Sequence, residues 1–211
     1  MTHKDTVGSA GNPARDKPVV LSRIYTRAGD DGTTALGDMS RTAKTDPRLA
    51  AYADTDEANC AVGMALALGG VADTIDADAV TLLARVQNEL FDVGADLCVP
   101  MSAELDYPPL RIDAAYTERL EEACDHYNAR LPTLRSFILP GGTPTAAALH
   151  TARTVARRAE RSAWAAVEAY GDDVNPEAVR YLNRLSDLLF ILARAANAAT
   201  GDVLWKPGGE R

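Results

Sequence analysis

Three helix starts with the same two-residue signature constrain the fold of this chain most. Asp46-Pro47, Thr143-Pro144 and Asn175-Pro176 each place a good N-cap residue directly before proline. The cap side chain accepts a hydrogen bond from a free backbone N–H group, and proline suits the first helical position because no N–H is needed there. These signatures therefore predict helices that begin at these residues.

Apolar periodicity and further caps predict five helices in all. Alanine dominates the apolar residues and aromatic residues make up only 6%, which favours closely packed helices over a β-sandwich. The predicted helices run from Asp46-Pro47 to Gly69-Gly70, from about Asp78 to Leu97, from Asp113 to near Leu131, from Thr143-Pro144 to just before Gly171, and from Asn175-Pro176 to near Gly201.

These elements predict an all-α protein with a single five-helix bundle domain. The expected organisation is a disordered N-terminal extension (residues 1–22), the helical-bundle domain (23–201) and a C-terminal tail (202–211). The extension is rich in Gly, Asp, Lys and Pro and has no apolar periodicity. Outside the helices, only short extended pieces near Ser22 and Ser136 are expected.

The 211 residues carry a net charge of −8, which argues against a nucleic-acid or anionic-membrane partner. No uncharged apolar run is long enough to span a membrane, and the polar N-terminus lacks the apolar core of a secretion signal. We therefore expect a cytoplasmic protein. Cys60, Cys98 and Cys124 are widely spaced and odd in number, which predicts buried small apolar residues in place of zinc ligands or disulfides.

The stretch RTVARRAER places Arg153, Arg157 and Arg161 on one face of the fourth helix, here called the arginine face. Arg158 and Glu160 flank it. Three guanidinium groups repel one another unless an anion lies between them, and their planar forks suit polyphosphate. The alternative is a solvated helix face with Glu160 as a local partner. On an acidic protein, the pattern favours a small, highly charged anion over a long polymer.

Polar residues also interrupt two helices that are otherwise apolar. Asn183, Asp187, Arg194 and Asn197 share a stripe on the last helix. Hydrogen bonds between helices, a solvent-facing seam, or a ligand or subunit contact would explain them, because unpaired polar groups are costly inside a protein. On the alanine-rich first helix, Asp56 is a candidate partner for an arginine of the fourth helix across an interface.

Two glycine-bearing loops add candidate contacts. In RAGDDGTT, Gly29 and Gly32 let backbone N–H groups close around phosphate oxygens, and threonine hydroxyls and Lys44 add donors. This segment matches neither a P-loop nor a dinucleotide-binding motif, and a plain turn is the alternative. In SFILPGGTP, Phe137 is either an anchor to the core or part of a binding surface.

Four motifs in a fixed order resemble those of the PduO-type ATP:cob(I)alamin adenosyltransferases. They are IYTRAGDDGTT, DPRLAAYADTDEAN, FILPGGTPTAAALHTARTVARRAER and NRLSDLLFILARAAN, and the resemblance spans about Ile24 to Asn197. It implies a homotrimer of five-helix bundles with active sites between neighbouring subunits. It also implies a reaction in which the 5′-deoxyadenosyl group of ATP moves to the cobalt of cob(I)alamin, giving adenosylcobalamin and triphosphate. Mg²⁺ is implied as a companion of ATP, held mainly by the phosphates.

The resemblance also implies roles by position. Asp56 and Arg153 match an ion pair between subunits, and Phe137 matches the aromatic residue that crowds the lower face of the corrin ring. Arg157 and Phe137 are the implied catalytic residues. Asp31 stands where the family often has lysine, so it is expected to face solvent or to help hold magnesium. The implied ATP contacts are Thr26, Arg27, Ala28, Gly29, Thr34, Ala35, Lys44, Arg157, Arg158, Ala159, Glu160, Arg161 and Asn183.

Two other functions remain as alternatives. A di-iron bundle needs Glu-x-x-His pairs, and none of His3, His126 and His150 follows a glutamate at that spacing. A sensor or carrier that binds ATP and a corrinoid without chemistry is the non-catalytic alternative. In the enzymatic interpretation, an adenosylcobalamin-dependent mutase is a candidate acceptor of the product.

Overall fold

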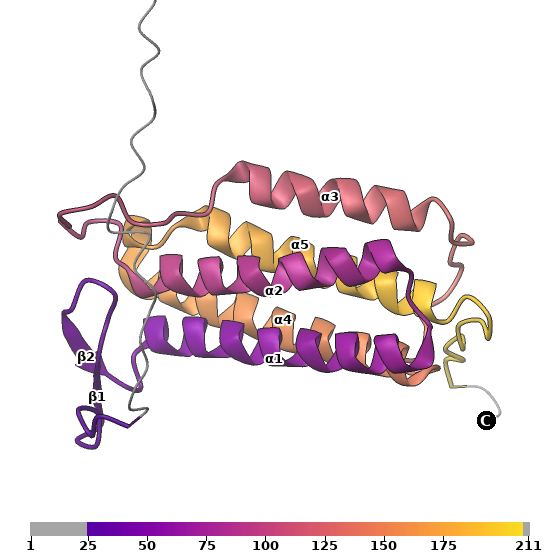
Figure 1. Ribbon diagram of the computed structural model, residues 1–211, viewed down its shortest axis with the longest axis horizontal. Coiled ribbons are helices and arrows are strands. Elements are labelled where there is room, and N and C mark those ends of the chain that lie inside the picture. The colour runs from indigo at the N-terminus through magenta and orange to yellow at the C-terminus, as the bar shows by residue number, and fades with distance from the viewer. Residues whose placement is uncertain (1–24, 209–211) are drawn as a thin grey trace, which may run out of the picture.

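The computed structural model describes residues 25–208, and these form a bundle of five long helices (Figure 1). Four helices form the body of the bundle, in which α1 packs against α2 and α4, and α4 packs against α5. The remaining helix, α3, lies outside α5. The elements are α1 (Pro47–Ala72), α2 (Ala77–Cys98), α3 (Ala114–Asn128), α4 (Pro144–Tyr170), the 3₁₀ turn η1 (Gly171–Asp173) and α5 (Pro176–Ala196). The predicted all-α five-helix bundle is confirmed.

Within residues 25–208, no helix combines the length and the apolar character needed to cross a lipid bilayer. The predicted N-terminal extension and the extended piece near Ser22 lie outside the described residues.

Each long helix begins at a side-chain cap, and the predicted starts agree with the structure to within two residues. The cap oxygens accept hydrogen bonds from backbone N–H groups in the first turn, which satisfies donors that have no partner inside the helix. The caps are Asp46, Asp76, Asp113, Thr143 and Asn175, and their donors are Arg48, Ala79, Ala115, Ala146 and Glu177.

The predicted end of α1 at Gly69-Gly70 is wrong, because the helix continues to Ala72. It ends before Asp73, which lies in the left-handed region with φ 50°. A Cβ on Gly69 would lie 2.6 Å from Cδ1 of Ile75. This glycine therefore allows the turn after α1 to pack closely against the helix and does not terminate it.

Two further predicted helix ends are wrong in the opposite direction, because these helices end earlier than predicted. α3 ends at Asn128 and not near Leu131, because Leu131 precedes Pro132 and that position disfavours helical conformation. α5 ends at Ala196 and not near Gly201. The side chain of the next residue, Asn197, accepts from the backbone N–H of Thr143 and donates to the carbonyl of Gly141, at 2.9 Å each, so it holds the loop before α4.

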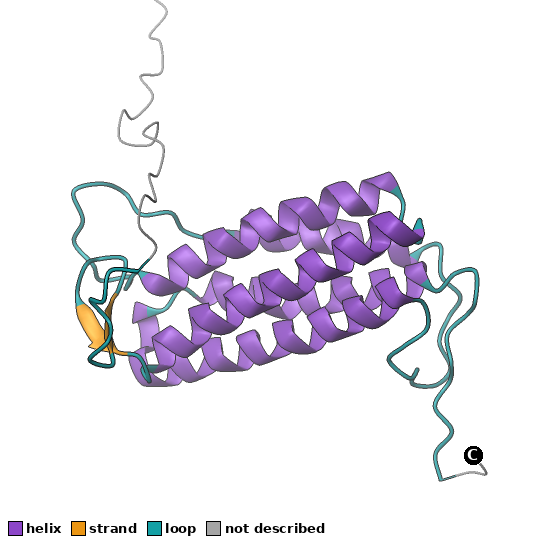
Figure 2. Cartoon of the chain, turned by 60° about the horizontal axis from the view of Figure 1, so that its bottom comes forward, coloured by secondary structure: helices purple, strands orange, loops and turns teal. Residues whose placement is uncertain are grey.

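A short antiparallel hairpin precedes α1 (Figure 2), and sequence analysis does not predict it. Its strands are β1 (Thr33–Ala35) and β2 (Arg41–Ala43), with Thr34 opposite Thr42. Three residues a strand are too few to produce a readable alternation of apolar and polar residues. The backbone N–H of Gly37 donates to the carbonyl of Cys98 at 3.0 Å, which ties the hairpin to the end of α2.

Small residues line the inner face of α4, and larger ones fill the space opposite. The alanines let the backbone of α4 approach its neighbours closely, while leucines of α5 supply most of the apolar volume. Both sets are almost completely buried, namely Ala146, Ala152, Ala156, Ala159, Ala163 and Ala166 of α4, and Leu182, Leu185, Leu188, Leu189 and Leu192 of α5. The arginine face lies on the other side of α4.

The cap of α5 is expected to be the most stabilising of the five, because Asn175 also bonds inside the protein. Its amide donates to Asp96 at 2.6 Å and to the carbonyl of Ile112 at 2.8 Å. Asn175→Ala should lower the free energy of unfolding by about 3 kcal/mol, since it removes the cap and leaves buried acceptors short of a donor. Urea unfolding followed by circular dichroism measures this loss.

Asp113→Ala is the matched control, because Asp113 caps α3 from an exposed position. It should cost only about 1 kcal/mol. Equal losses in the two variants would contradict a stabilising role for the buried bonds of Asn175.

Candidate active site

The arginine face of α4 carries two guanidinium groups that remain unpaired. Within residues 25–208, Arg157 and Arg161 are exposed and take part in no hydrogen bond or ion pair. Arg158 differs, because its guanidinium pairs with Asp54 (3.4 Å) and with Glu57 of α1. These ion pairs hold Arg158 against α1. Within this part of the chain, the exposed, unpaired positive charge of α4 therefore belongs to Arg157 and Arg161, while Arg153 is unpaired but half-buried.

Arg153 is half-buried and lacks a partner for its Nε atom. Burial lowers the pKa of its guanidinium, and the nearby charge of Arg157 lowers this pKa further. Asp56, its predicted partner, is exposed on α1, and within one copy of the chain the two side chains form no ion pair. A pair between them would therefore need the Asp56 of a second copy.

Two other predicted contacts meet at the outer edge of α4 and α5. The amide of Asn183 donates to the carboxylate of Glu160 at 2.8 Å. Ala159 is 0% exposed and packs in the core, so its side chain has no surface to offer a ligand. The local partner of Glu160 is thus an amide of α5, and not an arginine of its own helix.

Two adjoining clefts run along α4 and α5. The larger one has a volume of about 800 Å³ and the smaller one about 560 Å³. Leu134, Arg153 and Phe190 line both, so they form one continuous depression. Phe137 lies at the rim of the larger cleft with 79% of its surface exposed, and Arg157 lines the smaller one. The exposure of Phe137 favours the binding-surface interpretation over the core anchor.

Residues after α5 hold the loop that carries Phe137. The backbone N–H of Trp205 donates to the carbonyl of Phe137 at 2.7 Å, and that of Leu139 donates to Val203 at 2.8 Å. Ile138 and Leu204 form a β-bridge between these bonds, so the extended piece predicted near Ser136 is present. The rings of Phe137 and Trp205 meet edge to face at 6.1 Å. Trp205, expected to lie in the C-terminal tail, thus lines the cleft.

The polar stripe of α5 has two kinds of member. Arg194 and Asn197 are buried, and Arg194 bonds to Asp202 (2.9 Å) and to the carbonyl of Pro132 (2.7 Å). These two side chains fasten the loops around the cleft, so their hydrogen bonds join α5 to loops and not, as predicted, to other helices. Asp187 instead pairs with Arg184 one turn away, at 2.6 Å.

The glycine-bearing loop forms a compact turn next to the hairpin, and Lys44 rests against it. Arg27 has a φ of 62°, a conformation that costs energy for a residue with a side chain. A Cβ on Gly29 would lie 3.0 Å from Nζ of Lys44, so the ammonium group rests against this glycine. Three predicted ATP contacts, Arg27, Gly29 and Lys44, are therefore close together. Thr26 lies in the same turn, where its hydroxyl accepts a 3.4 Å bond from the N–H of Ala28. Thr34 and Ala35 lie in β1.

Asp31 has a structural role in this turn. Its carboxylate accepts bonds from the backbone N–H (3.0 Å) and the hydroxyl (2.8 Å) of Thr33. These bonds hold the pKa of Asp31 below its usual value, and Arg41 adds a 3.6 Å ion pair. The side chain is exposed, in agreement with the solvent-facing alternative.

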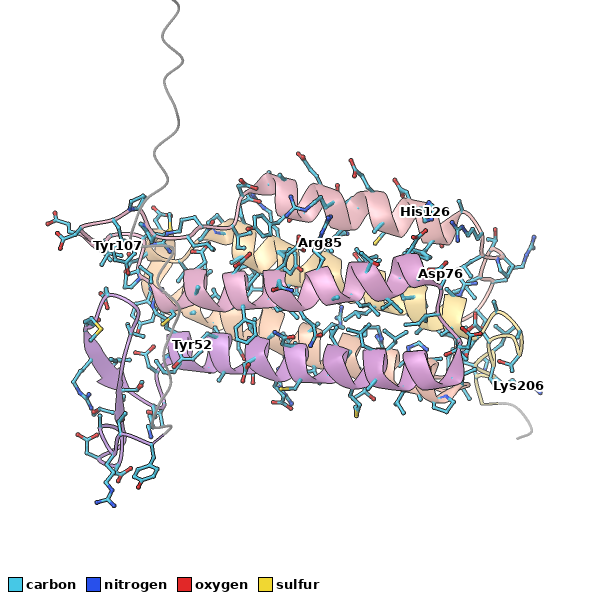
Figure 3. The ribbon with its side chains drawn as sticks, viewed as in Figure 1. Tyr52, Asp76, Arg85, Tyr107, His126 and Lys206 are labelled. Carbon is cyan, nitrogen blue, oxygen red and sulfur yellow. The ribbon has the colours of Figure 1, made fainter. Side chains whose placement is uncertain are left out.

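The predicted site residues fall into two groups that one copy of the chain keeps apart. The hairpin lies at the end of the bundle where α1 begins, whereas the loop before α4 and the segment after α5 lie at the other end (Figure 1). Figure 3 shows Lys206, which follows Trp205, far from Tyr52 near the start of α1. α4 spans the distance between these ends, and its 27 residues are about 40 Å long.

Among the residues of the larger cleft that sequence reasoning missed are His150 and Trp205. His150 precedes Arg153 by one helical turn, so helical spacing alone could have placed it on the same face. Trp205 gives no comparable signal, because its position depends on a contact with a loop 68 residues earlier.

Comparison with known proteins gives concordant results. Residues 24–196 match the cobalamin adenosyltransferase family. A corrinoid adenosyltransferase of Mycobacterium tuberculosis is 62% identical over 193 residues, which cover 92% of this chain and 97% of that protein. One from Bacillus subtilis is 41% identical over 180 residues, with 85% and 89% covered.

Among solved structures, a variant PduO-type ATP:corrinoid adenosyltransferase from Lactobacillus reuteri, complexed with cobalamin and ATP, superposes with a TM-score of 0.78. The two chains are 36% identical, and the match covers 87% of this chain and 99% of that one. The resemblance stated from the motifs is thereby confirmed, and the chain belongs to the cobalamin adenosyltransferase family.

Proposed function

We propose that this protein transfers the 5′-deoxyadenosyl group of ATP to the cobalt of cob(I)alamin, and that each active site is built from two copies of the chain. The observation that carries the proposal is that two arginines of α4, Arg157 and Arg161, have no ion pair within residues 25–208. They lie beside a large cleft that has the exposed Phe137 at its rim. Such a surface suits a polyphosphate next to a large, flat, mostly apolar ring.

ATP is proposed to lie between the hairpin end of one copy and the middle of α4 of its neighbour. The hairpin end offers the turn with Lys44 against it, and the neighbour offers the free guanidinium groups with an adjacent polar pair. The proposed contacts are Thr26, Arg27, Ala28, Gly29, Thr34, Ala35 and Lys44 from one copy, and Arg157, Glu160, Arg161 and Asn183 from the other. Arg158 does not fit this role because its guanidinium already pairs with Asp54 and Glu57. Ala159 does not fit it because its side chain is buried in the core.

Arg157 is proposed to stabilise the leaving group. Cob(I)alamin is a strong nucleophile, so the protein needs only to place it against the ribose C5′ atom and to stabilise the triphosphate as negative charge grows on it. A donor held in advance on a helix contributes about 3 kcal/mol to such stabilisation. Arg157 suits this task because it has no competing partner among the described residues.

Asp56 and Arg153 are proposed to join neighbouring copies in a homotrimer. Arg153 is half-buried with a positive charge, and Asp56 is exposed with no ion pair among the described residues. Closed rotational symmetry would form the same pair at each interface. It would also bring the hairpin of one copy toward the cleft of the next. Within a single copy, the hairpin and the cleft are about one helix length apart.

Magnesium is proposed to arrive with ATP. Among residues 25–208, no three His, Cys, Asp or Glu side chains gather in an arrangement that could hold a metal ion. Mg²⁺ commonly binds through substrate phosphates with one or two protein carboxylates, so the phosphates of ATP would supply most of its ligands. Bound there, it would neutralise part of the charge on the leaving triphosphate.

Phe137 is proposed to cover the lower face of the corrin ring. An exposed ring at the rim of the cleft would keep water and the lower axial base from cobalt, and cobalt without axial ligands is easier to reduce to the +1 state. The 2.7 Å bond from Trp205 holds the backbone of Phe137 in place.

The proposed compartment is the cytoplasm, where ATP is present. The three cysteines are free thiols, which agrees with a reducing compartment. An adenosylcobalamin-dependent mutase is the proposed acceptor of the product.

Arg157→Ala should abolish turnover while leaving the helical fold intact, because it removes charge stabilisation from the transition state and no contact from the core. The assay follows the absorption spectrum of adenosylcobalamin formed from ATP and chemically reduced cobalamin. Arg85→Ala, on the exposed surface of α2 (Figure 3), is the matched control and should react at the wild-type rate. Wild-type rates from Arg157→Ala would remove the leaving-group role. ATP binding by the wild type without any spectral change would favour the sensor or carrier.

Phe137→Ala should slow the reaction that starts from cob(II)alamin with a reductant far more than the reaction that starts from cob(I)alamin. Only the first depends on removing axial ligands before reduction. The comparison of the two rates in the same variant serves as its own control. Equal losses with both substrates would contradict the coordination role.

Asp56→Arg should weaken assembly, because it places like charges across the proposed interface. Combining it with Arg153→Asp should restore part of the trimer, since the pair is then present with reversed sign. Analytical ultracentrifugation of both variants measures the assembly. A trimer unaffected by Asp56→Arg would rule this ion pair out.

A further inference from the structure

Unsatisfied polar atoms are concentrated at the larger cleft, in His150 and Arg153, which line it, and in Asp202, whose charge acts on His150. Residues 25–208 contain six buried side-chain nitrogen or oxygen atoms that have no hydrogen-bond partner. Four of the six belong to His150, Arg153 and Asp202. Buried polar atoms without partners are rare because they are costly, so a cluster of them indicates that something from outside the chain completes the site.

The three side chains come from two segments that the fold fastens together. His150 and Arg153 are one helical turn apart on α4, and both line the cleft of about 800 Å³. Asp202 follows α5, where Arg194 holds its Oδ2 atom at 2.9 Å and leaves Oδ1 without a donor. The His150 ring is 3% exposed and meets Phe190 edge to face at 6.0 Å, so its orientation is restricted.

The cluster offers both donors and acceptors. Burial lowers the pKa of His150, Arg153 lowers it further and Asp202 opposes the shift, so the imidazole is neutral near pH 7. A neutral imidazole has one N–H donor and one acceptor nitrogen. Nε of Arg153 adds a donor, and Oδ1 of Asp202 adds an acceptor.

We propose that the His150–Arg153–Asp202 cluster binds a peripheral primary amide of the corrin ring and thereby selects amidated corrinoids. This inference rests on the proposed function and specifies its substrate. A primary amide carries an acceptor oxygen and two N–H donors, which matches the mixed character of the cluster. A carboxylate in the same place would have no donor for Oδ1 of Asp202 and would face its negative charge.

The proposed subsite also accounts for the position of the cluster. The corrin ring is planar and carries amide side chains around its edge, so a ring beneath Phe137 would direct some of them at the cleft wall. The guanidinium of Arg153 has further N–H groups besides Nε, and these remain for the Asp56 of a second copy. Subunit assembly and corrinoid selection would then share one arginine.

The test compares His150→Phe with the wild type on two kinds of substrate. One is cob(I)alamin, and the others are its derivatives in which a single peripheral amide is hydrolysed to a carboxylate. Phenylalanine preserves the ring contact with Phe190 and removes both nitrogens. His126→Phe, on α3 and away from the cleft (Figure 3), is the matched control.

The wild type should show a KM about tenfold higher for at least one monocarboxylate derivative than for cob(I)alamin. His150→Phe should raise the KM for cob(I)alamin about tenfold, leave kcat and the KM for ATP within about twofold, and lose the preference for the amide. His150→Gln, which keeps a donor and an acceptor, should recover much of the wild-type KM. An unchanged corrinoid KM in His150→Phe, or an intact preference, would overturn the proposal.

Calorimetric titration of the wild type with hydroxocobalamin and its monocarboxylates gives a second, independent measurement. Equal affinities for all of them would overturn the amide subsite, even if His150→Phe failed to fold. Failure of the wild type to form adenosylcobalamin would instead remove the proposed function. A remaining preference for the amide in the titration would then still support a corrinoid-binding cluster.

Discussion

The close contact of α4 with α1 and α5 is the constraint on which the rest of the structure depends. Alanines at nearly every inward position, such as Ala152, Ala156 and Ala159, bring the helix backbone against its neighbours and leave no room for larger side chains. A helix packed so tightly cannot rotate about its axis without burying charge. The small residues of the inner face therefore determine that Arg157 and Arg161 point away from the core.

Helix starts were predictable from the sequence, whereas the ends of α1, α3 and α5 were not, for a physical reason. An N-cap such as Thr143 satisfies N–H groups within its own first turn, so the signal and its effect lie in neighbouring residues. The end of α5 depends on Asn197 bonding to a loop 54 residues away, and the end of α1 depends on Asp73 adopting a left-handed conformation. Glycines in the sequence, such as Gly69-Gly70 near the end of α1, therefore do not by themselves mark where these helices end.

The candidate site divides in the same way. Helical spacing predicts that Arg153, Arg157 and Arg161 share a face, and the structure agrees. Which arginines stay free depends on the opposite surface, because carboxylates of α1 occupy Arg158 and leave Arg157 unpaired. The wall formed by His150 and Trp205 depends on how the segment after α5 returns to the loop before α4, a long-range contact that no local pattern encodes.

A site divided between copies suits the chemistry of a reactive, reduced corrinoid. One copy holds the turn proposed to bind the nucleotide at one end of a helix about 40 Å long, and the phenylalanine proposed to cover the corrin ring at the other. Only an assembled interface would bring a turn from one copy beside the arginines and the cleft of the next. Assembly would therefore create the site and exclude water from it in the same step, which protects a strong reductant from solvent until ATP is in place.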